Sequence, residues 1–132
     1  TFFFQKGLHL NKTRAYEAAI SSYEAALNLK PDYPDAWYNR GNSLYHLGRF
    51  ADAIASYDQA IEYQPAFPEA WNNRGNALDE LRRYEDAVVS YDQAIKYRQN
   101  YYWAWYNRGI SLRNMERYEE AVNSYDRAIE FK

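Results

Sequence analysis

Amide side chains recur along this chain at one spacing, and they are the residues best suited to recognition chemistry. Asn39, Asn73 and Asn107 lie 34 residues apart, and Gln5 holds the preceding place in the same series. A side-chain amide offers both donor and acceptor groups, which match the N–H and C=O groups of a polypeptide backbone. The series therefore predicts hydrogen bonding to an extended chain, with solvated or turn-capping asparagines as the alternative.

Charged side chains follow the same spacing. A basic residue comes directly after each amide, and an acidic residue stands 18 positions later. The four combinations are Lys6 with Glu24, Arg40 with Asp58, Arg74 with Asp92, and Arg108 with Asp126. A cation on a packed helix face is costly unless it is paired. We therefore expect an ion pair within each combination, with pairing to the adjacent repeat as the alternative.

No constellation typical of catalysis or metal binding is present. The chain has no cysteine, and its two histidines, His9 and His46, have no second ligand at metal spacing. No Gly-rich phosphate loop occurs. The acidic residues follow the repeat, which favours surface charge over acid–base machinery. The sequence therefore predicts a chain that is not an enzyme and that has neither a metal site nor a cofactor.

Two helices per repeat must position these side chains. Apolar residues over Trp37–Leu47 recur at steps of three and four, which indicates one face of a first helix. Gly48 interrupts the pattern, and the same steps resume over Phe50–Ile61 as a second helix, which Pro65 ends. So short a break makes the two helices an antiparallel hairpin.

Two local features are less regular. Gly41 lies inside the first helix, where glycine costs about 1 kcal/mol relative to alanine. Because Ala53 and Ala60 face it from the second helix, we expect a close approach of two backbones there.

The junction before the last repeat, residues 99–103, lacks proline. We expect an ordinary turn with Asn100 in the left-handed conformation, and fusion of the flanking helices is the alternative.

The pattern resembles the tetratricopeptide repeat. The signature places of that family are filled by Trp37, Gly41, Leu44, Gly48, Phe50, Ala53, Tyr57, Ala60 and Pro65. The resemblance covers the whole chain in four copies, roughly 1–33, 34–67, 68–101 and 102–132. The residues before the glycines depart from it, because Lys6, Arg40, Arg74 and Arg108 stand where leucine is usual. The resemblance implies an all-α fold, a right-handed superhelical solenoid of antiparallel helix pairs in one domain over residues 1–132.

In this family the first helices line a concave groove, and the resemblance implies that the amide series faces it. The series is similar to the asparagine ladder of O-linked N-acetylglucosamine transferases, whose asparagines hold extended peptides by their backbone. The expected groove residues are Asn39, Asn42, Asn73, Asn76, Asn107, Tyr38, Tyr45 and Tyr106. With helices about 10 Å apart and a peptide rise of about 3.3 Å per residue, one asparagine would meet the backbone at about every third residue.

The predicted function is a protein-interaction scaffold that binds an extended peptide or a partner helix in this groove. Two alternatives stay open. One is an accessory, substrate-recruiting domain of a larger enzyme. The other is a homo-oligomer formed through apolar ends that include Phe2, Tyr125, Ile129 and Phe131. A carboxylate clamp for chaperone tails is not expected, because the places of its cations hold Tyr38, Glu69, Asn73, Trp103 and Asn107.

Composition sets the remaining bounds. The 132 residues include 16 basic and 18 acidic side chains, so nothing suggests a nucleic-acid or membrane-surface partner. No apolar run approaches the roughly 20 residues of a membrane span. A chain without cysteine is compatible with oxidising and reducing compartments, and a cytoplasmic location is favoured. Because the chain begins inside a repeat and shows no polar capping element, we expect it to be an excerpt of a longer protein.

Overall fold

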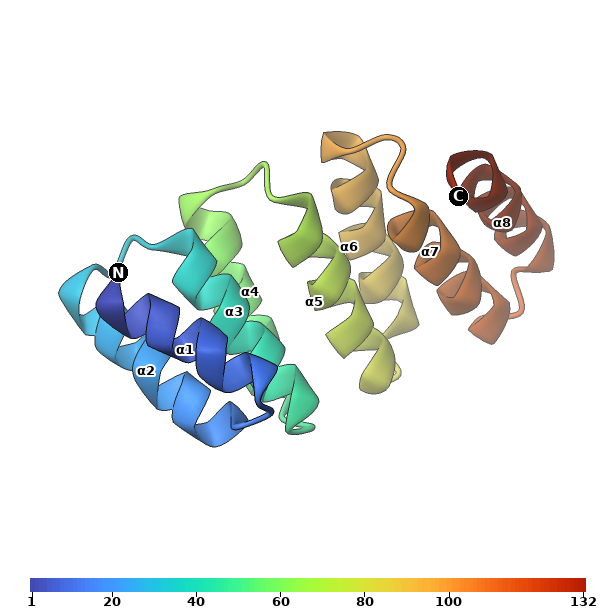
Figure 1. Ribbon diagram of the computed structural model, residues 1–132. Helices are drawn as coiled ribbons and strands as arrows, with labels where there is room; N and C mark the ends of the chain where they lie inside the picture. The colour runs from blue at the N-terminus through green and yellow to red at the C-terminus, as the bar shows by residue number, and fades with distance from the viewer. The chain divides into compact units, whose positions relative to one another are not determined.

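The computed structural model describes residues 1–132, which form eight α-helices and no strands. The helices belong to two compact units, Thr1–Pro65 and Ala66–Lys132 (Figure 1). The first unit contains α1 (Phe2–Lys12), α2 (Tyr16–Leu29), α3 (Pro34–His46) and α4 (Phe50–Tyr63). The second contains α5 (Pro68–Glu80), α6 (Tyr84–Tyr97), α7 (Tyr102–Asn114) and α8 (Tyr118–Phe131). The all-α prediction is confirmed, and each predicted repeat is one helical hairpin.

Each unit consists of two hairpins in contact. In the first unit α1 packs against α2 and α3 against α4, while α2 also packs against α3. In the second unit α5 packs against α6 and α7 against α8, while α6 also packs against α7. The first helices of each unit, α1 with α3 and α5 with α7, touch as well. Within a unit, each hairpin therefore buries its apolar face against its neighbour, as in other repeat proteins.

The turn inside each hairpin depends on one residue in the left-handed conformation. These residues are Arg14, Gly48, Arg82 and Glu116, with φ between 60° and 76°. In the first turn the Ala15 N–H donates to the Leu10 C=O at 2.8 Å, and the Arg14 N–H donates to the Asn11 C=O at 3.0 Å. This pair of bonds closes many helices. The predicted break at Gly48 is confirmed, but three of the four turns adopt the same conformation without glycine.

The proline-free junction before the last hairpin is an ordinary turn, and α6 and α7 remain separate helices. The prediction of a left-handed Asn100 is wrong. Instead, the Trp105 indole N–H donates to the Gln99 C=O at 2.9 Å. The Trp37 indole makes the same bond to the Pro31 C=O at 2.8 Å. A side chain of the following helix thus satisfies a backbone carbonyl of the turn, which needs no left-handed residue.

A contact between glycine and tyrosine lies at the centre of each hairpin. Tyr23, Tyr57 and Tyr91 are 0–1% exposed. A Cβ built on Gly75 would lie 2.5 Å from Cε1 of Tyr91, and the corresponding distances at the other three first-helix glycines are 2.5 and 2.6 Å. The glycine leaves room for the ring rather than for a second backbone, which corrects the interpretation given for Gly41.

Candidate peptide-binding face

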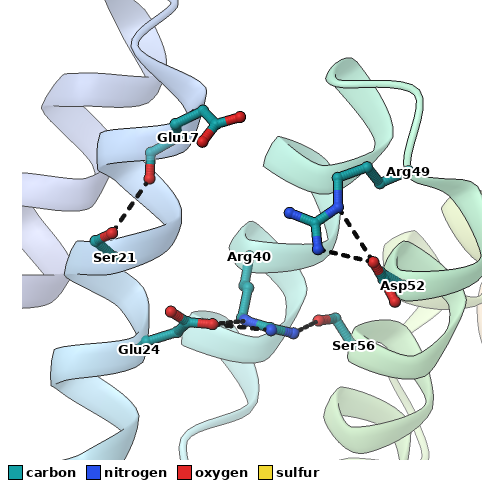
Figure 2. Close-up of polar contacts among 7 residues, drawn as sticks. All are labelled: Glu17, Ser21, Glu24, Arg40, Arg49, Asp52 and Ser56. Atoms are coloured by element: carbon teal, nitrogen blue, oxygen red, sulfur yellow. Dashed lines mark hydrogen bonds and ion pairs between the residues drawn. The ribbon is translucent and has the colours of Figure 1, made fainter.

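An arginine links the two hairpins of the first unit. Arg40 of α3 donates from Nη2 to Glu24 of α2 at 2.9 Å and from Nη1 to Ser56 of α4 at 2.5 Å (Figure 2). Its guanidinium carbon lies 5.8 Å from the centre of the Trp37 ring. Three helices therefore meet at one side chain, which leaves this arginine with little capacity for a ligand.

The second unit repeats this arrangement. Arg108 of α7 donates to Asp92 of α6 at 2.7 Å and to Ser124 of α8 at 2.7 Å. The pairing predicted within the hairpin, Arg108 with Asp126, is therefore wrong, and the same holds for Arg40 in the first unit. Pairing with the adjacent repeat is what the structure shows. The reason is helical geometry, because Asp126 follows the contacting serine by two residues and lies about 200° further around the helix.

The hydroxyl groups of two core tyrosines reach asparagines that were predicted to line the groove. The Tyr57 hydroxyl donates to Asn42 Oδ1 at 2.6 Å, and the Tyr91 hydroxyl oxygen lies 2.8 Å from Asn76 Oδ1. Burial raises the pKa of Tyr57 far above its usual range, so its hydroxyl remains a donor. Asn42 and Asn76 are half-buried and support the core, a role that sequence analysis did not foresee.

A half-buried carboxylate joins the two hairpins of the second unit. Asp79 of α5 accepts from the Tyr91 hydroxyl at 2.6 Å and from the Ser111 hydroxyl of α7 at 2.6 Å. Burial raises the pKa of Asp79 above its ordinary value, and the neighbouring Glu80 raises it further, while the two hydrogen bonds oppose the shift. Sequence analysis did not identify this contact.

The first unit uses an amide at the same repeat position. Asn11 donates to the Tyr23 hydroxyl at 3.2 Å and accepts from the Ser43 hydroxyl at 2.6 Å. Burial raises the pKa of Tyr23 to about 12, although the bond to Asn11 lowers it. Asn11 and Asp79 stand two periods apart, and each is followed 32 residues later by its serine partner. This shared spacing was the signal that could have revealed both contacts.

Three amides form a chain between α5 and α7. Asn107 Nδ2 donates to Asn72 Oδ1 at 3.3 Å, and Asn72 Nδ2 donates to Asn73 Oδ1 at 3.3 Å. Asn72 is 4% exposed, whereas Asn73 and Asn107 are half-buried. Sequence analysis missed Asn72, which takes the place of an aromatic residue in the other three hairpins. In the first unit Asn39 is also half-buried, and its Nδ2 donates to the Asp35 C=O at 2.8 Å.

Aromatic side chains gather at the start of α7. The ring centre of Tyr102 lies 4.8 Å from that of Trp103 and 5.9 Å from that of Tyr106. Trp103 is 57% exposed and Tyr106 is 37% exposed. In the first unit the predicted groove residues Tyr38 and Tyr45 are half-buried and pack against the core. The exposed aromatic surface of the predicted set therefore lies on α7.

No group of three or more His, Cys, Asp or Glu side chains is placed to hold a metal ion. His46 stacks on Tyr16, with ring centres 4.8 Å apart. None of the helices combines the length and the apolar character needed to cross a membrane.

The repeat pattern has a counterpart among known families. The profile described as TPR repeat matches residues 13–48 and 41–81, and the profile described as Tetratricopeptide repeat matches residues 68–101 and 102–132. The chain belongs to the tetratricopeptide repeat family. Tetratricopeptide repeats are generally non-catalytic protein-interaction scaffolds, and this chain has the scaffold that they share.

Solved structures contain the same tetratricopeptide repeat fold. A crystal structure of MamA matches with a TM-score of 0.94 at 19% identity, over 98% of this chain and 75% of that chain. The protein MamA 41-end from Desulfovibrio magneticus RS-1 matches with a TM-score of 0.91 at 19% identity, over 98% and 73% of the two chains. The first TPR of Spaghetti (RPAP3), bound to the HSP90 peptide SRMEEVD, matches with a TM-score of 0.85 at 23% identity, over 87% and 91%. These likenesses show a tetratricopeptide-like solenoid.

A curated relative shares part of this repeat array. An uncharacterized protein from Methanocaldococcus jannaschii is 33% identical over 51 residues, which are 39% of this chain and 59% of that protein. The match therefore spans about three fifths of the length of this relative.

Proposed function

We propose that this tetratricopeptide repeat chain captures an extended segment of a partner protein on the exposed face of its first helices. The observation that carries the proposal is the amide chain on α5 and α7. Its outer members, Asn73 and Asn107, are half-exposed, while the buried Asn72 between them fixes their orientation through hydrogen bonds at 3.3 Å. Such preorganised amides suit a polypeptide backbone, which needs a donor or an acceptor at regular intervals.

Two asparagine oxygens are available as acceptors. In Asn39 and Asn107 the Nδ2 group donates within the chain, to the Asp35 C=O and to Asn72 Oδ1 respectively. Neither Oδ1 atom accepts a hydrogen bond from the chain. A side chain already held in place loses little freedom when a ligand N–H group approaches. The expected contacts at Asn39 and Asn107 are therefore backbone N–H groups of the ligand.

Spacing in the second unit sets the register of the ligand. Because α5 and α7 touch, their axes lie about 8–10 Å apart, and an extended peptide rises about 3.3 Å per residue. Asn73 and Asn107 should therefore meet backbone groups about three residues apart. The exposed rings of Trp103 and Tyr106 on the helix of Asn107 supply side-chain contact of the kind enriched at binding hot spots.

Charge on α5 favours a ligand that is neutral or basic. Glu69, Asp79 and Glu80 all belong to this helix, and Glu69 is paired with Arg98 at 2.6 Å. A carboxylate tail brought to this face would meet like charge. The proposal therefore does not extend to a clamp for acidic chaperone tails.

The test uses nine-residue peptides selected from a random displayed library on the immobilised 132-residue chain. Removing both amides in Asn73→Ala/Asn107→Ala should weaken every selected peptide by a similar factor. At about 1 kcal/mol of net stabilisation for each hydrogen bond, the expected loss is roughly 30-fold in Kd. The control Asn28→Ala/Asn123→Ala removes two exposed asparagines of second helices and should leave Kd unchanged.

Calorimetric titration gives the dissociation constants, and circular dichroism verifies that both variants fold. A second series places N-methyl groups on the bound peptide, one residue at a time. Sensitivity should recur at about every third residue, where a backbone N–H is lost. Unchanged affinity in the double variant, or no periodic effect of N-methylation, would contradict the proposal.

A further inference from the structure

Arginines lie over the rings of the tryptophans in this chain, with one exception. Three of the four tryptophan rings have a guanidinium carbon 5.8–5.9 Å from their centre, in the pairs Arg40 with Trp37, Arg74 with Trp71, and Arg108 with Trp105. Trp103 has no cation on its ring, and its ring contacts only Tyr102 and Tyr106. It is also 57% exposed, whereas the other three tryptophans are half-buried. Trp103 therefore presents aromatic surface that no cation of the chain occupies.

The two tyrosines hold the Trp103 ring in a defined orientation. The ring planes of Tyr102 and Tyr106 are 9° apart, and the Trp103 ring stands at 76° and 82° to them. Edge-to-face arrangements of this kind are favourable, because the positive edge of one ring meets the negative face of another. Tyr106 in turn contacts Tyr125 of the same hairpin, with ring centres 5.9 Å apart. The Trp103 ring is thus held by its neighbours and loses little freedom when a ligand arrives.

An acidic side chain lies one period before Trp103, on the neighbouring first helix. Glu69 holds in α5 the position that Trp103 holds in α7, and the two helices touch. Glu69 Oε2 accepts from Arg98 at 2.6 Å, while Oε1 accepts no hydrogen bond from the chain. Because the two oxygens of a carboxylate offer about four acceptor sites, Glu69 has capacity for a second cation beside Arg98.

This repeat position is open in three of the hairpins. Asp35 holds it in α3 and is exposed, and the Glu69 side chain is 37% exposed although α7 packs beside α5. A following hairpin therefore leaves the position accessible. All three residues of the series, Asp35, Glu69 and Trp103, attract cations, two by their charge and one by the negative face of its ring.

We propose that Trp103 and Glu69 form a subsite for one basic side chain, lysine or arginine, of the captured segment. The inference rests on the proposed function and names the chemistry of its ligand. The cation lies over the Trp103 ring and donates to Glu69 Oε1. An acidic side chain at this place would meet Glu69 as a like charge, and an apolar one would leave the carboxylate unused.

The chain itself contains two examples of the proposed arrangement. In each, one arginine lies over a tryptophan ring and also pairs with a carboxylate of another helix. These examples are Arg40 with Trp37 and Glu24, and Arg108 with Trp105 and Asp92. The ligand would supply at Trp103 the cation that the chain supplies at the other two rings.

The position of the basic residue in the ligand follows from α7. Asn107 comes four residues after Trp103, which is about 6 Å along the helix. The long, flexible side chain of lysine or arginine bridges such a distance. The basic residue should therefore lie within about one residue of the one whose backbone N–H meets Asn107.

Nine-residue peptides selected from the displayed library on the parent chain give the first test. Lysine or arginine should be enriched at one position. That position should lie within about one residue of the N-methyl group that weakens binding to the parent but not to Asn107→Ala. Selection on Trp103→Leu, which keeps apolar bulk and removes the aromatic ring, should lose the enrichment.

Calorimetric titration gives the second test. Exchange of the basic residue for a neutral analogue, citrulline for arginine or norleucine for lysine, should weaken binding to the parent by about 3- to 30-fold. This is the combined size of an exposed cation–π contact and an exposed ion pair. The factor should fall by about two- to fivefold in Trp103→Leu, because the cation–π contact is already lost, and it should also fall in Glu69→Gln.

The matched control is Tyr118→Leu on α8, which removes another exposed ring, 59% accessible, outside the subsite. This variant should respond to the exchange as the parent does, and circular dichroism verifies that all variants fold. The subsite is overturned by selected peptides without a basic position, by a neutral analogue that binds the parent equally well, or by an exchange factor that Trp103→Leu or Glu69→Gln leaves unchanged.

These results are distinguishable from a failure of the proposed function. Any of them, together with weakened binding in Asn73→Ala/Asn107→Ala, overturns the cation subsite and leaves capture by the amides standing. An exchange factor that depends on Trp103 and Glu69, with no effect of the double amide variant, supports the subsite and overturns capture by the amides.

Discussion

Replacing Gly75 by alanine is expected to destabilise this chain, although alanine favours most helices. The added Cβ would lie 2.5 Å from Cε1 of Tyr91 and 2.8 Å from its Cδ1 and Cζ atoms, about 1 Å short of the optimal separation of two carbon atoms. The ring cannot swing away, because Tyr91 is fully buried. Its hydroxyl is also held by Asn76 at 2.8 Å and by Asp79 at 2.6 Å.

Two opposing effects set the size of the change. Removal of a helical glycine favours folding by about 1 kcal/mol. An extra methyl group in a packed core costs about 1–3 kcal/mol, and a ring held at both ends places Gly75 towards the upper limit. We therefore expect the free energy of unfolding to fall by about 2 kcal/mol. If the new methyl group did not meet the Tyr91 ring, the free energy of unfolding would instead rise by about 1 kcal/mol.

Urea unfolding followed by circular dichroism measures this difference, provided that the slope of the transition stays unchanged. The background variant Tyr91→Leu tests the cause, because removal of the ring makes room for the new methyl group. In that background Gly75→Ala should be neutral or favourable, so that the two substitutions are strongly non-additive. An alanine variant as stable as the parent, or an equal penalty in both backgrounds, would refute the explanation.

Two further predictions concern a turn and a titrating group. Glu116→Gly should stabilise the chain by about 0.5–1 kcal/mol, because a φ of 60° suits glycine. Gly48→Ala should destabilise it by at least about 1 kcal/mol, because alanine is strained in the left-handed conformation. Urea unfolding measures both changes, and effects of the same sign would contradict the reasoning. Asp79→Asn should stabilise the second unit at neutral pH, because burial raises the pKa of this carboxyl and Asn11 already holds the equivalent hydroxyl groups in the first unit. A raised folded-state pKa means that the parent loses stability relative to the variant as the pH rises from about 4 through that pKa. In thermal melts, the melting temperature of the variant should therefore exceed that of the parent by an amount that grows over this interval.

The hairpins could be predicted because helical periodicity and helix breakers are local properties of the sequence. Glycine at position 48 and proline at positions 34 and 68 mark boundaries by their own backbone preferences. The other turns were harder to read in detail. Arg14, Arg82 and Glu116 adopt the left-handed conformation because the packing of the hairpin imposes it, not because these residues favour it.

The polar contacts could be predicted only in part, because a repeat array offers each side chain two neighbours at the same repeat position. Arg108 could have paired with Asp126 of its own hairpin or with Asp92 of the preceding one. Only the geometry of the packed helices shows that its partner is Asp92. Likewise, the spacing of Asn73 and Asn107 was evident from the sequence. Their link through Asn72 depends on how α5 lies against α7.

The contact of Arg40 with three helices has a consequence for cooperativity. If the first hairpin opened alone, the guanidinium would lose Glu24 while its bond to Ser56 remained, and the opening would leave a partly buried cation without its counter-charge. In a chain of coupled repeats, such a penalty contributes to the interaction free energy between neighbouring hairpins and not to the intrinsic stability of either hairpin. Because salt screens the ion pair and leaves the apolar packing of each hairpin intact, rising ionic strength would loosen the coupling before it melts the helices, and the two hairpins would begin to open as separate units.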